Sequence, residues 1–107
     1  MLIDHRTYRV KPGTVKPHLE LYEKYGLVPQ SRHLGKPVAY MFAESGDLNT
    51  IVHMWAYETL DERTEKRARL AADPGWQAYV AQLLPLMAVQ ESKILNPAPF
   101  FNVKIQD

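Results

Sequence analysis

The chain has 107 residues, of which 46% are hydrophobic and 23% charged, a composition typical of one soluble globular domain spanning residues 1–107. Thirteen basic and twelve acidic residues leave a formal net charge of +1, which argues against a protein that follows the phosphates of nucleic acid or an anionic membrane surface. The chain has no cysteine, which excludes disulfides, thiol nucleophiles and thiolate metal sites and suits a reducing compartment.

The N-terminal segment contains no recognisable targeting signal. Asp4 and Arg6 lie where a signal peptide would have an apolar run, and no stretch of the sequence reaches the length of a transmembrane helix. We therefore expect a cytoplasmic protein without membrane insertion.

The first predicted strand covers residues 1–10, which are rich in β-forming residues and end at "KPG", residues 11–13. The apolar spacing that follows predicts a helix that begins after Thr14 as N-cap and ends at Gly26 as a left-handed C-cap. Residues 27–36 are then expected to form a polar connection.

Two strands and a turn are predicted next. The stretch "PVAYMFAE", residues 37–44, has the composition of a strand, and "SGDLN", residues 45–49, has the composition of a turn. The following stretch "NTIVHMWAYE", residues 49–58, alternates as a strand does. The short turn between the two strands predicts a β-hairpin.

A pair of helices is predicted after this hairpin. Thr59 and Glu62 have the spacing of a capping box, and the helix that they start should reach about Ala72. Asp73 and Pro74 then have the order of an N-cap and a first helical position, so a second helix should begin there.

The second helix carries an apolar stripe along residues 76–87, which predicts one buried face. Pro85 lies inside this stripe and should kink the helix or end it near Leu84. Beyond it, residues 91–96 are predicted as the final strand of the sheet. The alternation in residues 100–105 predicts a further strand.

The predicted element order is β-α-β-β-α-α-β, which is the ferredoxin-like α+β pattern. In this topology the first and third strands are neighbours in the middle of a four-stranded antiparallel sheet, and the helices cover one face. The other face, with Val38, Tyr40 and Phe42 or their neighbours and Trp55, would be left as an exposed apolar patch. A second copy of the chain would cover it, so we expect a homodimer.

Four sequence stretches resemble the NIPSNAP family, and they occur in the same order over most of the chain: "HRTYRVKPG" (5–13), "GDLNTIVHMWAYETLDER" (46–63), "DPGW" (73–76) and "ESKILNPAPF" (91–100). The resemblance implies a dimeric α/β barrel, in which two ferredoxin-like sheets close around a cavity. Relatives of that wider fold include cofactor-free monooxygenases, haem-binding peroxidases and muconolactone isomerases, so the fold alone does not define a reaction.

The family supplies no agreed catalytic residues that could be transferred to this chain. One departure from similar sequences is Asp4, where glutamate is more common before the "RTY" stretch. The shorter side chain of Asp4 weakens any role that depends on reach.

The strand at residues 49–58 presents different side chains on its two faces. Its apolar set is expected to pack against the helices, and its other set is expected to face the barrel interior. The apolar set is Val52, Met54 and Ala56, and the other set is His53, Trp55 and Tyr57.

The first strand offers Asp4, Arg6 and Tyr8 on one side. We expect this side to line the barrel cavity, because a charged pair under the helices would be expensive to bury, whereas beside a wet pocket it can be paired and hydrated. His53, Arg6 and Trp55 would then meet in one pocket.

Each of these residues has a functional and a structural interpretation. His53 and Arg6 are the candidate catalytic residues, since an imidazole with a pKa near neutrality can move a proton and an arginine can hold a developing anion. His53 could instead be a hydrogen-bonded structural imidazole, a ligand anchor or a metal ligand. Arg6 and Asp4 could form only an ion pair.

The candidate substrate-binding residues are Trp55, Tyr57, Tyr8 and Asp4. Trp55 could flank a planar group or be a wall of the core, and the tyrosines could donate to a substrate oxygen or serve an interface. On the first helix of the predicted pair, the spacing of Arg63, Arg67 and Leu70 is interpreted as a solvated face.

The histidines lack metal-binding spacing, and the sequence has neither a phosphate-binding glycine loop nor a serine elbow, so we expect no metal site and no cofactor. Two functions stay open. One is an oxygenase-like or isomerase-like enzyme that acts on a small organic molecule in the barrel cavity, and the other is a non-catalytic module that binds a small molecule or a protein. Haem binding with His53 as axial ligand is a third.

Overall fold

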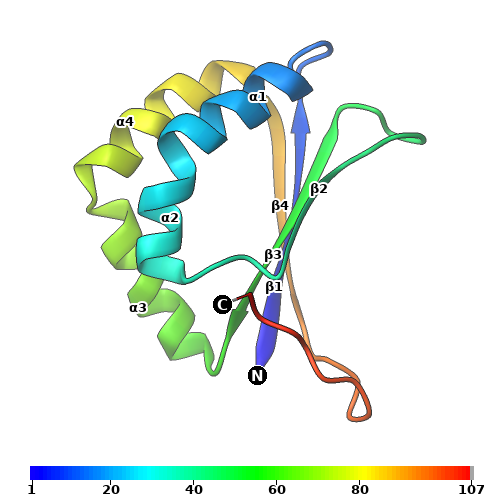
Figure 1. The fold of residues 1–107 in the computed structure, drawn as a ribbon, viewed down its shortest axis with the longest axis vertical. Helices are drawn as coiled ribbons and strands as arrows, with labels where there is room; N and C mark the ends of the chain where they lie inside the picture. The colour runs from blue at the N-terminus through cyan, green and yellow to red at the C-terminus, as the bar shows by residue number, and fades with distance from the viewer. Residues whose placement is uncertain (107) are drawn as a thin grey trace.

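Figure 1 shows the computed structural model of the chain, which describes residues 1–106. The elements in chain order are β1 (Leu2–Val10), α1 (Val15–Leu21), the π-helical segment η1 (Tyr22–Gly26), α2 (Leu27–Leu34), β2 (Ala39–Phe42), β3 (Thr50–Tyr57), α3 (Leu60–Ala71), α4 (Pro74–Leu83), the 3-10 segment η2 (Leu84–Leu86) and β4 (Met87–Leu95). If the continuous run of α1, η1 and α2 is counted as one helical element, this is the β-α-β-β-α-α-β order that the sequence predicts.

The strands form one antiparallel four-stranded sheet in the order β2-β3-β1-β4. The central strand β1 pairs with both β3 and β4, so that Arg6 lies opposite His53 on one side and Ser92 on the other. The helices lie together on one face of this sheet (Figure 1). The ferredoxin-like topology and the predicted pairing of the first and third strands are therefore confirmed.

The helical run after β1 is longer than predicted. It continues from α1 through η1 into α2, and Gly26 has a right-handed helical conformation with φ −97°. A β-carbon at Gly26 would lie 2.8 Å from the ring of Tyr22 and 2.9 Å from that of Tyr79, so glycine is needed there for close packing. The left-handed glycine that ends the run is Gly35, with φ 79°. The predictions of a C-cap at Gly26 and a polar connection over residues 27–36 are wrong.

The predicted N-caps of the next two helices, Thr59 and Asp73, are confirmed, but the predicted capping box is not fully reciprocal, because Glu62 bonds to the N–H of Glu58 and not to that of Thr59. Thr59 Oγ1 accepts a hydrogen bond from the N–H of Glu62 at 3.0 Å, and the Glu62 carboxylate accepts one from the N–H of Glu58 at 2.6 Å. Asp73 Oδ1 accepts a hydrogen bond from the N–H of Gly75 at 2.8 Å. The bonds accepted by Thr59 and Asp73 satisfy free N–H groups at the start of α3 and α4.

The end of the chain differs from the prediction in two places. Helix α4 ends at Leu83 and Pro85 lies in η2, as expected, but β4 already begins at Met87. Residues 100–105 are not a strand, because the segment reaches the open face of the sheet, where Phe101 and Val103 share a cavity with Ile3. Alternation supports a strand only where a sheet edge is within reach.

The expected orientation of β3 is reversed. Its buried residues are those at the odd positions, Ile51, His53, Trp55 and Tyr57, while the side chains of Val52, Met54 and Ala56 are only partly covered. Trp55 packs against Leu34 of α2 and Leu70 of α3, so this face lies under the helices. The prediction that His53, Trp55 and Tyr57 face the interior of a barrel is wrong, because the largest side chains fill the wide space between sheet and helices.

The open face of the sheet is consequently formed by other residues than predicted. The register places Ala39 and Met41 of β2 beside Met54 and Val52 of β3 on this face, whereas Tyr40 lies opposite His53 on the helix side. The face is partly apolar. None of the helices in residues 1–106 combines the length and apolar character needed to cross a bilayer.

Candidate functional site

The candidate site lies between the sheet and the helices. Asp4, Arg6 and Tyr8 of β1 share this face with His53 of β3, and all four side chains are buried. The sequence therefore predicted correctly that these side chains lie together. Its expectation that they line a barrel cavity is wrong, because their face is covered by the helix layer.

Asp4 is the electrostatic centre of this region. Its carboxylate accepts hydrogen bonds from Ser92 Oγ at 2.6 Å, from Arg63 Nε at 2.9 Å and from Arg6 Nη1 at 3.3 Å. Burial raises the pKa of Asp4, but these hydrogen bonds and the arginine charges outweigh burial and lower the pKa below its ordinary value. The buried charged pair is thus stabilised by donors from α3 and β4, which the sequence analysis did not foresee.

Arg6 is held in place by its neighbours. Besides its contact with Asp4, its Nε donates a hydrogen bond to the Tyr8 hydroxyl at 3.2 Å. Two of the nitrogens of the guanidinium group are therefore engaged within the protein. Asp4 and Tyr8 act here as positioning partners of Arg6.

His53 is a neutral hydrogen-bond donor. Trp55 Nε1 donates to His53 Nδ1 at 2.7 Å, so in the neutral imidazole the proton is on Nε2. Within residues 1–106, Nε2 has no hydrogen-bond partner. Burial, followed by the positive charge of Arg6, lowers the pKa of His53 to about 3, which replaces the expected pKa near neutrality.

Aromatic rings hold the imidazole in position. Tyr40 stacks on His53 with ring centroids 4.8 Å apart, and Tyr8 meets it edge-on at 4.6 Å. Tyr22 stacks in turn on Tyr40 at 4.6 Å, and its hydroxyl donates to the side-chain oxygen of Gln30 at 2.6 Å. This column links β3 to η1 and α2, and π-helical segments such as η1 are frequent at functional sites.

A cavity of about 190 Å³, here called the central cavity, adjoins these groups. Two of the residues that line it, Leu84 of η2 and Gln90 of β4, are exposed to solvent. Its lining residues come from sheet and helices and are Arg6, Tyr8, Tyr22, Gln30, Tyr40, His53, Arg67, Trp76, Tyr79, Val80, Leu83, Leu84 and Gln90.

Arg67 is the main lining residue that the sequence analysis missed. It lies one turn after Arg63 on α3, and both side chains are partly buried, whereas the prediction was a solvated face. The signal was present in the spacing, because Arg63, Arg67 and the buried Leu70 form an i, i+4, i+7 stripe. Two arginines on the stripe of a buried leucine point towards the sheet.

The remaining predicted site residues do not line the central cavity. Asp4 and Trp55 are fully buried beside it, and Trp55 is a wall of the core that also orients His53. Tyr57 lines a separate cavity of about 180 Å³, here called the end cavity. The structure thus brings Arg6, Tyr8 and His53 together and separates Tyr57 from them.

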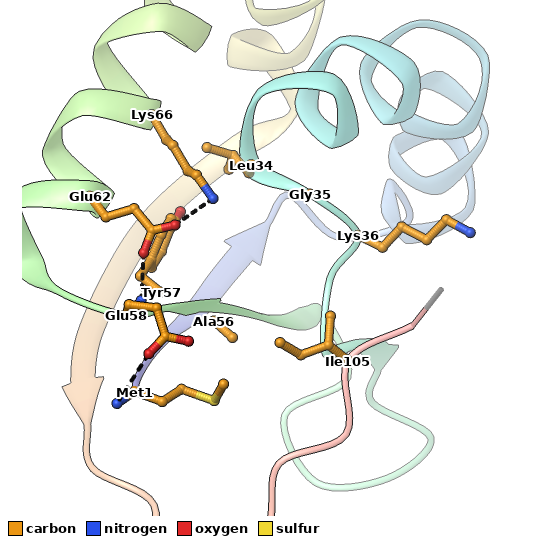
Figure 2. A pocket seen from close by; sticks show the side chains of 10 residues that line it. All are labelled: Met1, Leu34, Gly35, Lys36, Ala56, Tyr57, Glu58, Glu62, Lys66 and Ile105. Atoms are coloured by element: carbon orange, nitrogen blue, oxygen red, sulfur yellow. Dashed lines mark hydrogen bonds and ion pairs between the residues drawn. The ribbon is translucent and has the colours of Figure 1, made fainter.

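Figure 2 shows the end cavity, with Glu58, Glu62 and Lys66 on one side and Ile105 of the C-terminal segment on the other. Lys66 forms an ion pair with Glu62 at 2.7 Å, and the amino group of Met1 is 4.0 Å from Glu58. These charges compensate one another. The end cavity is therefore a weaker candidate than the central cavity for binding a charged molecule.

Metal and haem fit the site poorly. Within residues 1–106, no group of three or more histidine, cysteine, aspartate or glutamate side chains is arranged to hold a metal ion. The central cavity, at about 190 Å³, is also smaller than the roughly 300–1,000 Å³ of pockets that hold drug-sized ligands and large cofactors, so it is too small for a haem but not for a molecule with a single ring. His53 as an axial haem ligand is not supported by this geometry.

The comparisons with known proteins agree on one family. A family model described as NIPSNAP matches residues 3–102. The human protein NipSnap homolog 3A is 34% identical over 99 residues, which cover 91% of this chain and 39% of the human protein. The chain spans 18% to 40% of the length of the curated relatives compared with it.

Solved structures support the same relationship. The protein Atu4242 from Agrobacterium tumefaciens, described as a NIPSNAP family protein with unknown function, superimposes with a TM-score of 0.94 at 43% identity, covering 97% of this chain and 100% of the other. An antibiotic biosynthesis monooxygenase superimposes with a TM-score of 0.64 at 18% identity, covering 92% of this chain and 100% of the other. The second similarity concerns the fold alone.

Proposed function

The chain belongs to the NIPSNAP family, and on this premise we propose that it binds or transforms a small organic molecule in the central cavity. The observation that carries the proposal is the Nε2–H of His53, a buried donor without a partner within residues 1–106. Leaving such a donor unpaired costs about 1–3 kcal/mol, and unpaired buried groups in native proteins often have a functional reason. A ligand oxygen in the cavity would satisfy it.

The chemistry that suits this site is stabilisation of an oxyanion. A neutral imidazole can donate from Nε2 to the oxygen of an enolate, and the positive charge of Arg6 would favour that negative charge, provided that the carbonyl compound is acidic enough to lose its α-proton to solvent before it binds. Isomerisation through an enolate and reaction of an enolate with oxygen both begin with this species. The proposed activity is therefore isomerase-like or oxygenase-like, with His53 as donor and Arg6 as charge stabiliser.

A non-catalytic binding module is the second candidate, and the pKa values favour it. The pKa of His53 is about 3, and burial raises the pKa of both Tyr22 and Tyr40 above the ordinary value of tyrosine. None of these three groups exchanges a proton readily near neutral pH. A site of this kind could hold a metabolite without converting it.

The proposed assembly is a homodimer in which a second copy covers the open face of the sheet. The apolar side chains of Met41, Val52 and Met54 on that face support it. In such a barrel the central cavity would lie between each sheet and its own helices. We further propose a cytoplasmic location and no nucleic-acid partner, supported by the absence of cysteine and a net charge of +1.

A ligand screen tests the proposed function. Single-ring carbonyl compounds and acids are added to the parent protein, to His53→Gln and to His33→Gln, and the shift of the unfolding temperature is measured. His33 hydrogen-bonds to Asp73 outside the central cavity and serves as the control. We expect at least one compound to stabilise the parent and the control but not His53→Gln. The proposal fails if no compound distinguishes them.

A further inference from the structure

The region around Asp4 contains more positive than negative charge. The two carboxylate oxygens of Asp4 are occupied by Ser92, Arg63 and Arg6. Arg67, which lines the central cavity, has neither a carboxylate partner nor a hydrogen bond within residues 1–106. One carboxylate thus serves two of the three neighbouring arginines, and the third guanidinium is left uncompensated.

This arrangement is unfavourable for the protein alone. Burial and the positive charges of Arg6 and Arg63 lower the pKa of Arg67, which means that its surroundings disfavour the charge. A half-buried cation with cationic neighbours is a site where an anion would relieve repulsion. The planar fork of a guanidinium fits a carboxylate through two parallel hydrogen bonds.

The other walls of the central cavity restrict the kind of molecule to which the bound carboxylate can belong. Trp76 and Tyr79 provide aromatic surface, which packs well against a planar group, whereas the ring of Tyr40 is already stacked on His53 and Tyr22. A cavity of about 150 Å³ is known to hold benzene. The central cavity, at about 190 Å³, therefore has the size of one ring with a small substituent.

We propose that the molecule bound in the central cavity is a small planar carboxylic acid, with its carboxylate on Arg67 and its ring among the aromatic walls. This rests on the proposed function and gives it a ligand class. Arg67 is thereby assigned as the residue that binds the carboxylate, while Arg6, whose guanidinium already bonds to Asp4 and Tyr8, keeps only its role of favouring negative charge on the ligand oxygen that meets His53.

The test compares acids with neutral molecules of the same shape. Benzoate, 4-hydroxybenzoate and phenylacetate, each paired with its carboxamide, are titrated to millimolar concentration into the parent protein, Arg67→Gln, Arg67→Lys and Arg69→Gln. Arg69 lies two residues further on α3, is exposed and pairs with Glu65, so it is the matched control. Inorganic phosphate is titrated as an anion without a ring.

We expect at least one of the acids to bind the parent and Arg69→Gln equally, and to bind Arg67→Gln roughly tenfold to a hundredfold more weakly, as for the loss of hydrogen bonds to a charged group. Arg67→Lys should be intermediate, because it keeps the charge without the fork. The carboxamides should bind the parent protein and the three variants with equal affinity.

Two different failures can be told apart. If the carboxamides bind the parent as tightly as the acids, or if Arg67→Gln keeps full affinity for the acids, the carboxylate inference is overturned while small-molecule binding stands. If phosphate binds more tightly than any acid, the ring is not recognised and the inference also falls. If none of the compounds binds, both the inference and the proposed function are contradicted for molecules of this size.

Discussion

Trp55 donates a hydrogen bond from Nε1 to Nδ1 of His53 at 2.7 Å, and both side chains are buried. The bond runs between two residues on the same face of β3, two positions apart. Because an indole can only donate, Nδ1 of His53 must accept, which leaves the proton of the neutral imidazole on Nε2. One core residue thus determines which atom of His53 can meet a ligand.

Replacing Trp55 by phenylalanine removes this hydrogen bond, so the tautomer of His53 should no longer be fixed. We expect a loss of about 2–4 kcal/mol in the free energy of unfolding, from lost volume and an unpaired Nδ1. Urea denaturation measures the loss, and ¹⁵N shifts of His53 report the tautomer. Trp76→Phe is the control, because Trp76 lines the central cavity and its indole N–H has no hydrogen bond within residues 1–106. An unchanged His53 tautomer in Trp55→Phe would contradict the assignment.

Apart from α2 and the strand expected at residues 100–105, the sequence predicted the elements, and it predicted the grouping of Asp4, Arg6 and His53, but it did not predict which sheet face holds them. Alternation specifies which side chains share a face, whereas the covered face depends on contacts distant in sequence. Asp4 accepts hydrogen bonds from Arg63 and Ser92, which are 59 and 88 residues away along the chain. Burying a charge without partners is costly, and for this reason the sequence alone favoured a position of Asp4 beside water. The donors from distant segments offset that cost, but the sequence does not reveal them.

Two buried histidines should make the protein sensitive to acid. Burial lowers the pKa of His18 to about 4 and that of His53 to about 3, against 6.5 for the ordinary side chain. Because the unfolded chain binds more protons between these values, this contribution to stability is complete above pH 6.5 and is lost as the pH falls towards 4 and then 3. Each histidine contributes at most about 1.4 kcal/mol per pH unit.

Urea denaturation at pH 7.5, 5.5 and 4.5 measures this dependence. His18→Gln and His53→Gln should each flatten the fall in stability between pH 6.5 and 4.5. Val28→Ala, at an exposed and non-titrating position of α2, should keep the parent slope. Equal slopes for all four proteins would show that other groups govern the acid response.

Gly26→Ala should destabilise the junction between the helical run and α4. The added β-carbon would lie within 2.9 Å of the rings of both Tyr22 and Tyr79, and these rings are buried and cannot move freely. We expect a loss of about 1–3 kcal/mol, typical of overpacking, although alanine normally favours a helix over glycine. Glu23→Ala, at an exposed position of η1, is the control. A more stable Gly26→Ala variant would mean that the rings move aside.

Val52→Lys tests the proposed dimer. Val52 lies on the open face of the sheet, opposite Thr7 of β1 and Met41 of β2. If a second copy covers this face, a lysine there would bury an unpaired charge, and sedimentation at micromolar concentration should change from dimer to monomer. Val28→Lys, on the exposed side of α2, should remain dimeric. A parent protein that sediments as a monomer would contradict the dimer.

Arg67→Gln should make the protein more stable, although it removes a charged side chain from a half-buried site. The neighbouring Arg6 and Arg63 repel Arg67, and no carboxylate within residues 1–106 compensates it. After screening by solvent, the gain should be a few tenths to about 1 kcal/mol, and it should shrink as salt is added. Arg69→Gln loses only its exposed pair with Glu65 and should be neutral or slightly destabilising.

Thermal unfolding of both variants at low and high salt measures this difference. A residue whose removal stabilises the fold is not kept for stability, and this separates Arg67 from Arg63, whose bond to Asp4 supports the core. If Arg67→Gln is destabilised as strongly as Arg63→Gln, Arg67 has a structural role. Its guanidinium would then be engaged within the protein and would not be available to the carboxylate proposed for the central cavity.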